Sequence, residues 1–133
     1  IMVVSLYFEE ANNERYNDLK SKKKSQIFST YKSIYITSAT IALKLNLSPL
    51  KIKTKHEFIQ DAKLSENERI MLNFIALTYS KDINILENSE EIFNLTDKLA
   101  NAGFEILYEE IAENPGDRLK NLVNYTSQEF WDA

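Results

Sequence analysis

A long helical pattern runs through the stretch SEEIFNLTDKLANAGFEILYEEIAE, residues 89–113 of the 133-residue chain. Its apolar side chains recur every three or four residues, which places them on one face of a helix. They form a stripe and a second row beside it: Ile92, Leu95, Leu99, Gly103, Ile106 and Leu107, then Phe93, Ala100, Phe104 and Ile111. A glycine inside a helix costs about 1 kcal/mol relative to alanine. We therefore expect Gly103 to mark either a close approach to another helix or a break.

Two stretches earlier in the chain carry shorter helical patterns. The apolar residues of segment 25–48 recur at the same spacing, and its helix should end before Pro49, because a residue that precedes proline is disfavoured in the α region. Many of its residues are β-branched, so burial must stabilise this helix. Segment 9–20 is mostly polar, and we expect its helix to turn Tyr16 and Leu19 inward.

Two further helices are expected, one before and one after the 89–113 stretch. Segment 69–79, RIMLNFIALTY, is apolar around most of its circumference, which is typical of a central helix, and Ser65 and Glu68 ahead of it have the spacing of a capping box. The last helix is expected to follow an N-cap at Asn114. It should bury the apolar residues of segment 117–131: Leu119, Leu122, Val123, Phe130 and part of Trp131.

The remaining stretches predict shorter elements. The β-branched and aromatic residues of MVVSLYF, residues 2–8, favour a short strand or an extended arm. Thr54 and Glu57 have capping-box spacing, which predicts a short helix over residues 55–62 within a segment that otherwise resembles a loop or a short strand. The chain is therefore predicted to be mainly α, with a single compact helical domain over residues 1–133, five or six helices and a short N-terminal strand element.

Composition agrees with this prediction. The chain has two Gly and two Pro, whereas an all-β protein of this length needs many tight turns. The absence of Cys excludes disulfides, Cys-ligated zinc and iron–sulfur clusters. The apolar N-terminal segment is too short to cross a membrane and lacks the features of a signal peptide. We expect a cytoplasmic protein without a membrane partner, and the sequence leaves its oligomeric state open.

Charge is distributed unevenly along the chain. Residues 1–66 carry 11 Lys and Arg against 7 Asp and Glu, whereas residues 67–133 carry 5 against 13. The lysines of the first half could contact the phosphates of DNA: Lys20, Lys22, Lys23, Lys24, Lys51, Lys53 and Lys55. Arginine, the usual residue for bidentate phosphate and guanine contacts, is absent from residues 20–63. A solvated surface is therefore the competing interpretation.

Two other patterns resemble functional motifs. IALKLNLSPLKI, residues 41–52, has the rhythm of a helix-turn-helix, with Asn46 at the turn. The apolar anchor that a reading helix needs is missing at His56, so we interpret this stretch as a helix end that leads into an exposed loop. His56 is the only histidine and no nucleophile motif accompanies it, which favours a surface residue. We predict no catalytic residue, no cofactor and no metal site.

An acidic row follows the apolar stripe of the long helical stretch. Glu105, Glu109 and Glu113 recur every four residues, so a helix would place them on one face. Carboxylate bundles that bind two metal ions need Glu-x-x-His pairs from several helices, and this chain has none. We interpret the row as a solvated surface that could dock a basic partner, together with the exposed part of Trp131.

Two segments resemble one protein family, and two further stretches extend the resemblance. Residues 28–49, FSTYKSIYITSATIALKLNLSP, are similar to its Phe-x-Thr-Tyr-(Arg/Lys)-x-(Ile/Val/Leu) entry into a helix rich in small residues. Residues 99–126, LANAGFEILYEEIAENPGDRLKNLVNYT, are similar to its Ala-Asn-(Ala/Gly)-Gly-(Leu/Phe)-Glu-Ile-Leu run. The connector LNFIALTYSKDINIL, residues 72–86, and VVSLYF, residues 3–8, extend the resemblance to nearly the whole chain. The family is Dnd system-associated protein 4, small proteins that accompany the DNA phosphorothioation machinery.

The resemblance implies a setting among restriction and anti-phage defence components. It supplies no catalytic residues. Residues 49–57 depart from the family, since they are Lys-rich where it has an Arg- and Gly-rich loop, and its Gly-Gly pair is here Ala102-Gly103. We expect a non-enzymatic accessory protein that contacts other Dnd-system proteins. The alternative is a nucleic-acid-binding accessory that uses the Lys-rich region 20–63.

Overall fold

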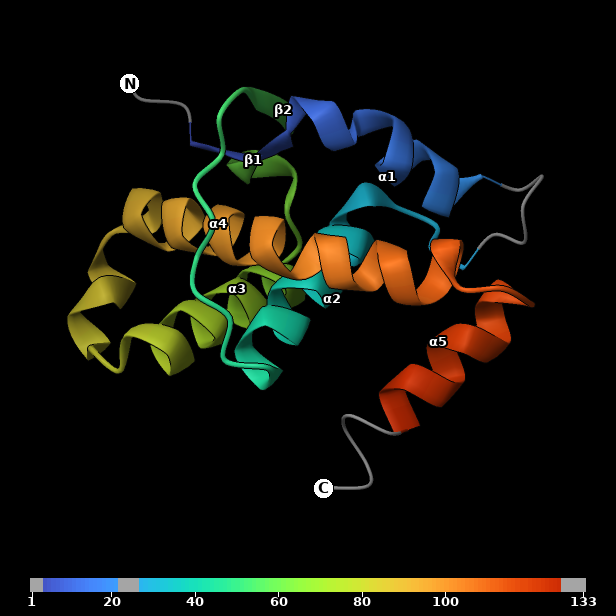
Figure 1. Ribbon diagram of the computed structural model, residues 1–133. Coiled ribbons are helices and arrows are strands. Elements are labelled where there is room, and N and C mark those ends of the chain that lie inside the picture. Colours follow the sequence, from blue (N-terminus) through green and yellow to red (C-terminus); the bar gives the residue numbers. More distant parts are fainter. Residues whose placement is uncertain (1–3, 22–26, 128–133) are drawn as a thin grey trace.

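The computed structural model describes residues 4–21 and 27–127. Helices dominate this part of the chain, and two strands form a small sheet near the N-terminus (Figure 1). The prediction of a mainly α fold with a short N-terminal strand element is confirmed. In chain order the elements are β1 (Ser5–Glu9), η1 (Glu10–Asn12), α1 (Asn13–Lys20), α2 (Tyr31–Lys44), β2 (Lys55–Gln60), η3 (Asp61–Lys63), α3 (Glu66–Ser80), η4 (Ile83–Glu87), α4 (Ser89–Tyr108), η5 (Glu109–Glu113) and α5 (Arg118–Thr126).

Helices α2 and α4 form the central pair of the fold, and their backbones touch at Gly103. A Cβ atom built on Gly103 would lie 1.8 Å from the carbonyl oxygen of Ser38 and 3.2 Å from the backbone nitrogen of Ala42. Helix α4 continues through Gly103 to Tyr108 without a break. Of the two roles predicted for Gly103, close approach to another helix is therefore confirmed.

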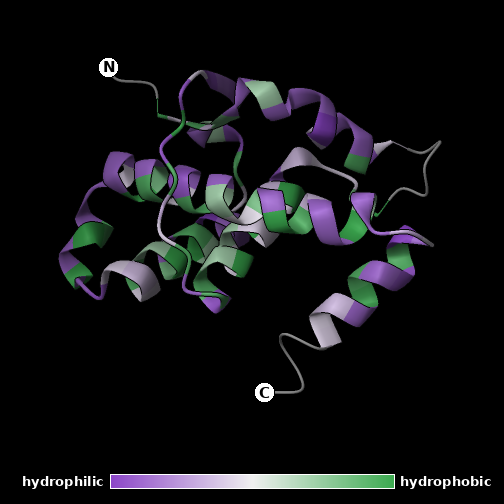
Figure 2. Ribbon diagram, viewed as in Figure 1, coloured by the Kyte–Doolittle hydropathy of each residue, from purple (hydrophilic) through white to green (hydrophobic). Residues whose placement is uncertain are grey.

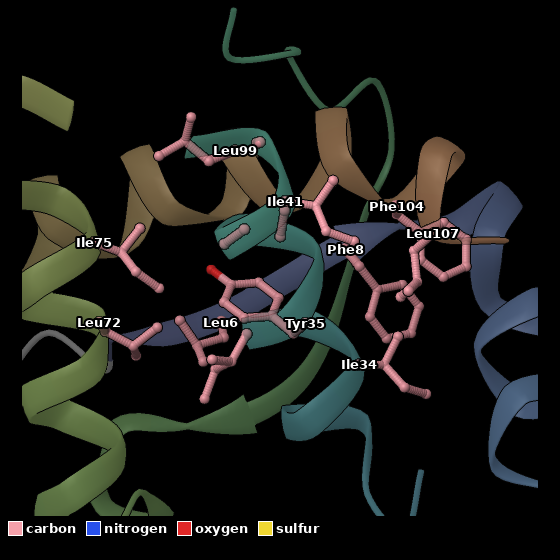
Figure 3. Close-up of a cluster of buried hydrophobic side chains, with 14 of the residues drawn as sticks. Leu6, Phe8, Ile34, Tyr35, Ile41, Leu72, Ile75, Leu99, Phe104 and Leu107 are labelled. Carbon is pink, nitrogen blue, oxygen red and sulfur yellow. The ribbon is translucent and has the colours of Figure 1, made fainter. Parts of the chain in front are cut away.

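The other elements pack around this pair to form the core. Aromatic rings link β1, α1 and α4, because Tyr16 stacks between Phe8 and Phe104 at centroid distances of 4.0 and 4.5 Å. Tyr16 and Leu19 are both buried, as predicted. Figure 3 shows part of the buried cluster, with labelled side chains from β1 (Leu6 and Phe8), α2 (Ile34, Tyr35 and Ile41), α3 (Leu72 and Ile75) and α4 (Leu99, Phe104 and Leu107).

The prediction of a short helix over residues 55–62 is wrong, because residues 55–60 form strand β2. It pairs antiparallel with β1, with Leu6 opposite Ile59 and Phe8 opposite His56, and the register shifts between Leu6 and Tyr7. The Glu9 carboxylate accepts hydrogen bonds from the N–H groups of Lys53 and Thr54, both at 2.9 Å, just before β2 begins. Capping-box spacing is a local signal, and the backbone partners that β1 offers outweigh it.

Helix α2 begins and ends within the stretch predicted for it. It starts at Tyr31, where the side chain of Thr30 accepts a hydrogen bond from Ser33 N, and it ends at Lys44. Asn46 then adopts a left-handed conformation with φ 55°, and the chain continues to β2 without a second helix. Residues 41–52 are therefore a helix end and a loop, as interpreted from the sequence. Asn101 of α4 holds this loop by donating to the Leu50 carbonyl oxygen at 3.1 Å.

Helix α3 is not central, contrary to the expectation from its apolar circumference. The capping box of Ser65 and Glu68 is present, as predicted. Only the side that faces α2 and α4 is buried, through Leu72, Ile75 and Ala76. The opposite side exposes Ile70, Met71 and Phe74, which are 56%, 47% and 67% exposed. An apolar circumference does not show whether the rest of the chain is large enough to cover both sides of a helix.

Helix α5 also differs from its prediction. Its N-cap is Asp117, whose side chain accepts from the N–H groups of Leu119 and Lys120, and not Asn114. Leu119 and Val123 were expected to be buried but are 56% and 52% exposed, whereas Tyr125 is buried. Leu122 is partly buried against the core. Residues 128–133, with Phe130 and Trp131, lie outside the described residues. Within the described ranges, no helix has the length and apolar character that crossing a membrane requires.

Candidate functional site

Three of the lysines suggested for nucleic-acid contact, Lys51, Lys53 and Lys55, lie among carboxylates. Lys51 and Lys53 border a hollow of about 610 Å³ that is also lined by acidic residues: Glu9, Glu10 and Glu105. Lys55 lies in a different cleft, together with Glu90, Glu91 and Asp97. Negative charge beside each of these lysines opposes the approach of a phosphate backbone.

The other lysines of this group lie at the end of α1 and beyond it. The Lys20 ammonium is 5.1 Å from the centre of the Tyr31 ring, a cation–π distance. Lys22, Lys23 and Lys24 lie outside the described residues. The structure therefore places Lys51 and Lys53 beside one hollow and Lys55 beside another.

A short DNA duplex is expected to bind this protein weakly. The physical reason is the set of carboxylates beside Lys51, Lys53 and Lys55, which offsets the charge that phosphates need. Fluorescence anisotropy at about 50 and 200 mM salt measures this directly. Tight binding that falls steeply between the two salt concentrations, and that weakens when Lys22, Lys23 and Lys24 are replaced by Ala, would contradict the expectation.

The residues of the acidic row lie in two different places. Glu105 forms an ion pair with Arg15 at 2.9 Å and borders the hollow of Lys51 and Lys53. Glu109 and Glu113 border another hollow with Glu110, where the helix changes from α to π geometry in η5. Trp131 lies outside the described residues. Docking of a basic partner at Glu105, Glu109 and Glu113 stays a prediction.

His56 has the environment of a partly exposed structural residue. Its Nδ1 lies 2.9 Å from a carboxylate oxygen of Glu10, and its ring stacks on Phe8 at a centroid distance of 4.9 Å. Among the described residues, no hydrogen bond joins His56 to a hydroxyl group that it could activate as a nucleophile. Nor do any three His, Asp or Glu side chains in this part of the chain come together in a way that could hold a metal ion.

Asp97 is the feature that sequence reasoning missed. It is 3% exposed, and no other acidic side chain in the described ranges is buried. Its Oδ1 accepts from the Tyr35 hydroxyl at 2.6 Å and from the Tyr7 N–H at 3.1 Å, so one oxygen joins α2, β1 and α4. The sequence held a signal for this burial, because Asp97 lies four residues after Phe93 and three before Ala100, within the second apolar row.

Burial changes the pKa values of Asp97 and of the two tyrosines Tyr35 and Tyr16. It raises the pKa of Asp97 to about 7, against the hydrogen bonds from Tyr35 and Tyr7 and the positive charge of Lys55. Burial first, and then the negative charge of Asp97, raise the pKa of Tyr35 and of Tyr16 above the usual tyrosine value. Asp97 is therefore the group of this cluster that gains or loses its proton near neutral pH.

Asp97 also lines a cleft of about 510 Å³ between β1, β2 and the first turns of α4. The size falls within the usual range of small-molecule sites. Tyr7 and Lys55 border it on the sheet side, and Glu90, Glu91 and Asn94 border it on the α4 side. Figure 1 shows how β1 lies along the start of α4. A cleft that contains a buried carboxyl group with a raised pKa is the strongest candidate site in the described part of the chain.

Comparison with known proteins places the chain in a family. A family model described as DNA sulphur modification system-associated protein 4 matches residues 9–131. No curated protein and no solved structure matches the chain. The match covers helices α1 to α5 and strand β2. It includes Asp97 and Tyr35, and it begins two residues after Tyr7. The chain therefore belongs to the DNA sulphur modification system-associated protein 4 family.

Proposed function

We propose that this chain is a non-enzymatic accessory protein of a DNA sulphur modification system used in restriction or anti-phage defence, and that it acts in the cytoplasm by binding another protein of that system. Membership of the family supports the association with the system. The environment of His56 supports a role without catalysis, because no nucleophile–base pair forms around it in the described residues.

The exposed side of α3 carries this proposal. Phe74 lies four residues after Ile70 and three after Met71, so its side chain adjoins both of theirs on the helix, and each of the three is about half exposed or more. Figure 2 shows hydrophobic positions along α3 and continuing into η4, where Ile83 is 70% exposed. Contiguous exposed apolar side chains of this kind mark interaction surfaces in soluble proteins.

A groove adjoins this face and adds depth to it. Helix α2 contributes Ile36, Thr37 and Thr40, and Met71 of α3 and Leu122 of α5 border the same space of about 430 Å³. Because Met71 belongs both to the exposed face and to the groove, a bound protein could cover the two surfaces together. Apolar side chains that enter such a groove are the usual anchors of protein interfaces.

The charges around the face indicate the chemistry of the partner. Glu66, Asp82 and Glu87 are exposed on α3 and in the η4 region that follows it, against one exposed basic side chain there, Lys81. Residues 67–133 as a whole carry 5 basic against 13 acidic side chains. The proposed partner is therefore a protein of the same system whose contact surface is apolar at its centre and basic at its edge.

Replacing both Ile70 and Phe74 by Ser is expected to weaken binding of this partner by at least about tenfold, because interface centres with large apolar side chains carry most of the affinity. The matched control replaces Leu119 and Val123 of α5 by Ser, which removes two apolar side chains of similar exposure outside the α3 face. Isothermal titration calorimetry with each separately purified protein of the system measures the affinities. Circular dichroism verifies that both variants remain folded.

Three outcomes would overturn docking through α3. The control variant could weaken binding as much as the α3 variant. Reversal of Glu105, Glu109 and Glu113 to Lys could abolish binding while the α3 variant binds normally, which would place docking on the acidic row. Sedimentation analysis could show that the α3 face binds a second copy of this chain, with self-association lost in the Ile70→Ser, Phe74→Ser variant.

A further inference from the structure

We propose that the cleft beside Asp97 binds a cation that carries N–H donors, namely a guanidinium or primary ammonium group. The inference goes beyond the proposed function and does not depend on it. The site consists of Asp97 at the inner end, with Glu90, Glu91 and Asn94 of α4 and Tyr7 and Lys55 of the sheet around it. Glu90 and Glu91 are among the exposed residues of this lining.

The unpartnered oxygen of Asp97 is the first observation that points to a ligand. Both hydrogen bonds to this carboxyl group, from Tyr35 and from Tyr7 N–H, reach Oδ1. Oδ2 receives none from the described residues, although Asp97 is 3% exposed and lines the cleft. No oxygen of Asp97 is both fully buried and without a hydrogen-bond partner, so Oδ2 is reachable from the cleft and can accept a hydrogen bond from a donor that arrives there.

The charge of the lining selects a cation. Glu90 and Glu91 are exposed, and no ion pair is formed by either of them within the described residues. With Asp97 they set three carboxyl groups against the single ammonium of Lys55. A phosphate or carboxylate ligand would be repelled by this lining, whereas a cation would be attracted to it.

The arrangement favours an organic cation over a metal ion. No group of three acidic side chains in the described ranges is positioned to hold a metal, so Asp97, Glu90 and Glu91 do not converge on one point. A guanidinium or ammonium group needs only one close carboxylate and can reach further acceptors with its other N–H groups. The Lys55 ammonium lies 5.2 Å from the centre of the Tyr7 ring, which is a cation–π distance. A positive charge is therefore compatible with this side of the cleft.

Binding should depend on pH because the cation prefers ionised Asp97. The groups that face Asp97 are the Tyr35 and Tyr16 rings from α2 and α1, Lys55 from β2, and the Tyr7 N–H from β1. Since the pKa of Asp97 is about 7, most molecules carry a neutral Asp97 at pH 6 and an ionised one at pH 8. Affinity should therefore rise by up to about tenfold between these two pH values.

The test is a nuclear magnetic resonance titration of the full chain with defined probes. Ethylguanidinium presents the cationic group alone, and N-acetyl-arginine amide presents it on a protein-like side chain. Tetramethylammonium, which has charge but no N–H donor, is the control ligand. The reporters are the Tyr7 amide, which donates to Asp97, and the side-chain amide of Asn94 in the cleft. We expect saturable shifts with the first two ligands, stronger at pH 8 than at pH 6.

Variants connect the shifts to the cleft. Asp97→Asn keeps an acceptor for Tyr35 and Tyr7 and should weaken binding by at least about tenfold and remove its pH dependence. The double variant Glu90→Gln, Glu91→Gln alters exposed residues only and should weaken binding about threefold. Glu110→Gln, at the other end of the same helical segment, is the matched control and should bind as the unaltered chain does.

Each outcome supports or overturns the site. Binding of both guanidinium probes supports a side chain of a partner protein as the source, and binding of ethylguanidinium alone supports a small diffusible cation. Equal shifts with tetramethylammonium, or no saturable shift with either guanidinium probe, overturn the proposal. So does binding that is unchanged in Asp97→Asn. If that variant does not fold, unchanged binding in the Glu90→Gln, Glu91→Gln variant overturns it.

Discussion

Replacing Gly103 by Ala is expected to lower the free energy of unfolding by about 2 kcal/mol or more, although alanine is the better helix former. The new Cβ would lie 1.8 Å from Ser38 O and 2.7 Å from Ser38 C, both of them backbone atoms of α2. A backbone carbonyl in mid-helix cannot rotate away as a flexible side chain can. Helices α2 and α4 must therefore separate by about an ångström, and the whole interface between them loosens.

The size of this effect follows from two opposing contributions. Overpacking of a well-packed core costs about 1 to 3 kcal/mol and sometimes more, and contact with rigid backbone places Gly103 at the upper end. The gain in helix preference returns about 1 kcal/mol. The central pair carries Ala39, Ala42, Leu99 and Ala100 in the same buried cluster, so the loss extends beyond one contact.

Urea unfolding followed by circular dichroism measures the effect of Gly103→Ala. The neighbouring change Ala102→Gly is the matched control, because it removes a Cβ one position away from the contact. It should cost about 1 kcal/mol through helix preference, together with a smaller loss from the partial burial of the Ala102 methyl group against the core. A Gly103→Ala variant that is as stable as the unaltered chain would show that the two helices are not held in backbone contact.

Replacing Asp97 by Asn is expected to remove a large part of the pH dependence of stability. Burial raises the pKa of Asp97 to about 7 in the folded protein, whereas an aspartate in the unfolded chain has a pKa of about 3.9. Between these values the folded state keeps a proton that the unfolded state has lost. Asp97 therefore makes the protein less stable as pH rises from about 4 to about 7, and it has little further influence beyond either end.

The expected difference is on the order of 4 kcal/mol across this window, since each unit of pKa corresponds to about 1.4 kcal/mol. Asn cannot titrate, and it can still accept hydrogen bonds from Tyr35 and Tyr7 in place of Oδ1. Asp97→Asn should therefore gain stability relative to the unaltered chain as pH rises to 7, and this advantage should stay constant above it.

Urea unfolding of both proteins from about pH 4.5 to 8.5 tests this prediction through the difference between the two curves. Glu9 and Glu68 act in the opposite direction, because hydrogen bonds from Lys53 N and Thr54 N to Glu9, and from Ser65 N and Lys32 to Glu68, lower the pKa of both carboxyl groups. Their contribution is lost as pH falls, but it is common to both proteins and cancels in the difference. Parallel curves would show that Asp97 ionises as readily in the folded protein as in the unfolded chain.

The helices could be predicted because their signals are local. The stripe that begins at Ile92, the capping box of Ser65 and Glu68, and the stop before Pro49 each depend on residues within a few turns of one another. The helical pattern around Gly103 also allowed two roles to be predicted for it, close approach to another helix or a break in the helix. The backbone distance to Ser38 was needed to choose between them.

The errors came from segments whose environment is supplied by distant parts of the chain. Residues 55–60 have a local helix signal, yet they form a strand because β1 lies beside them. Leu119 and Val123 have the pattern of buried residues, but no element covers them within the described ranges. The candidate site shows the same limit, since Tyr7, Tyr35 and Asp97 are far apart in the sequence and meet only in the fold.

The sequence by itself determined the mainly α class, the position of most helices and the family of this protein, because periodicity, capping and family motifs are contained in short segments. Tertiary structure alone decided that α3 leaves Ile70, Met71 and Phe74 uncovered and that Asp97 has a free oxygen in a cleft. The physical reason is that the pattern of residue types along a segment shows which environment each side chain favours. Whether the side chain is buried, and which partners it has, depends on the remote segments that pack against it.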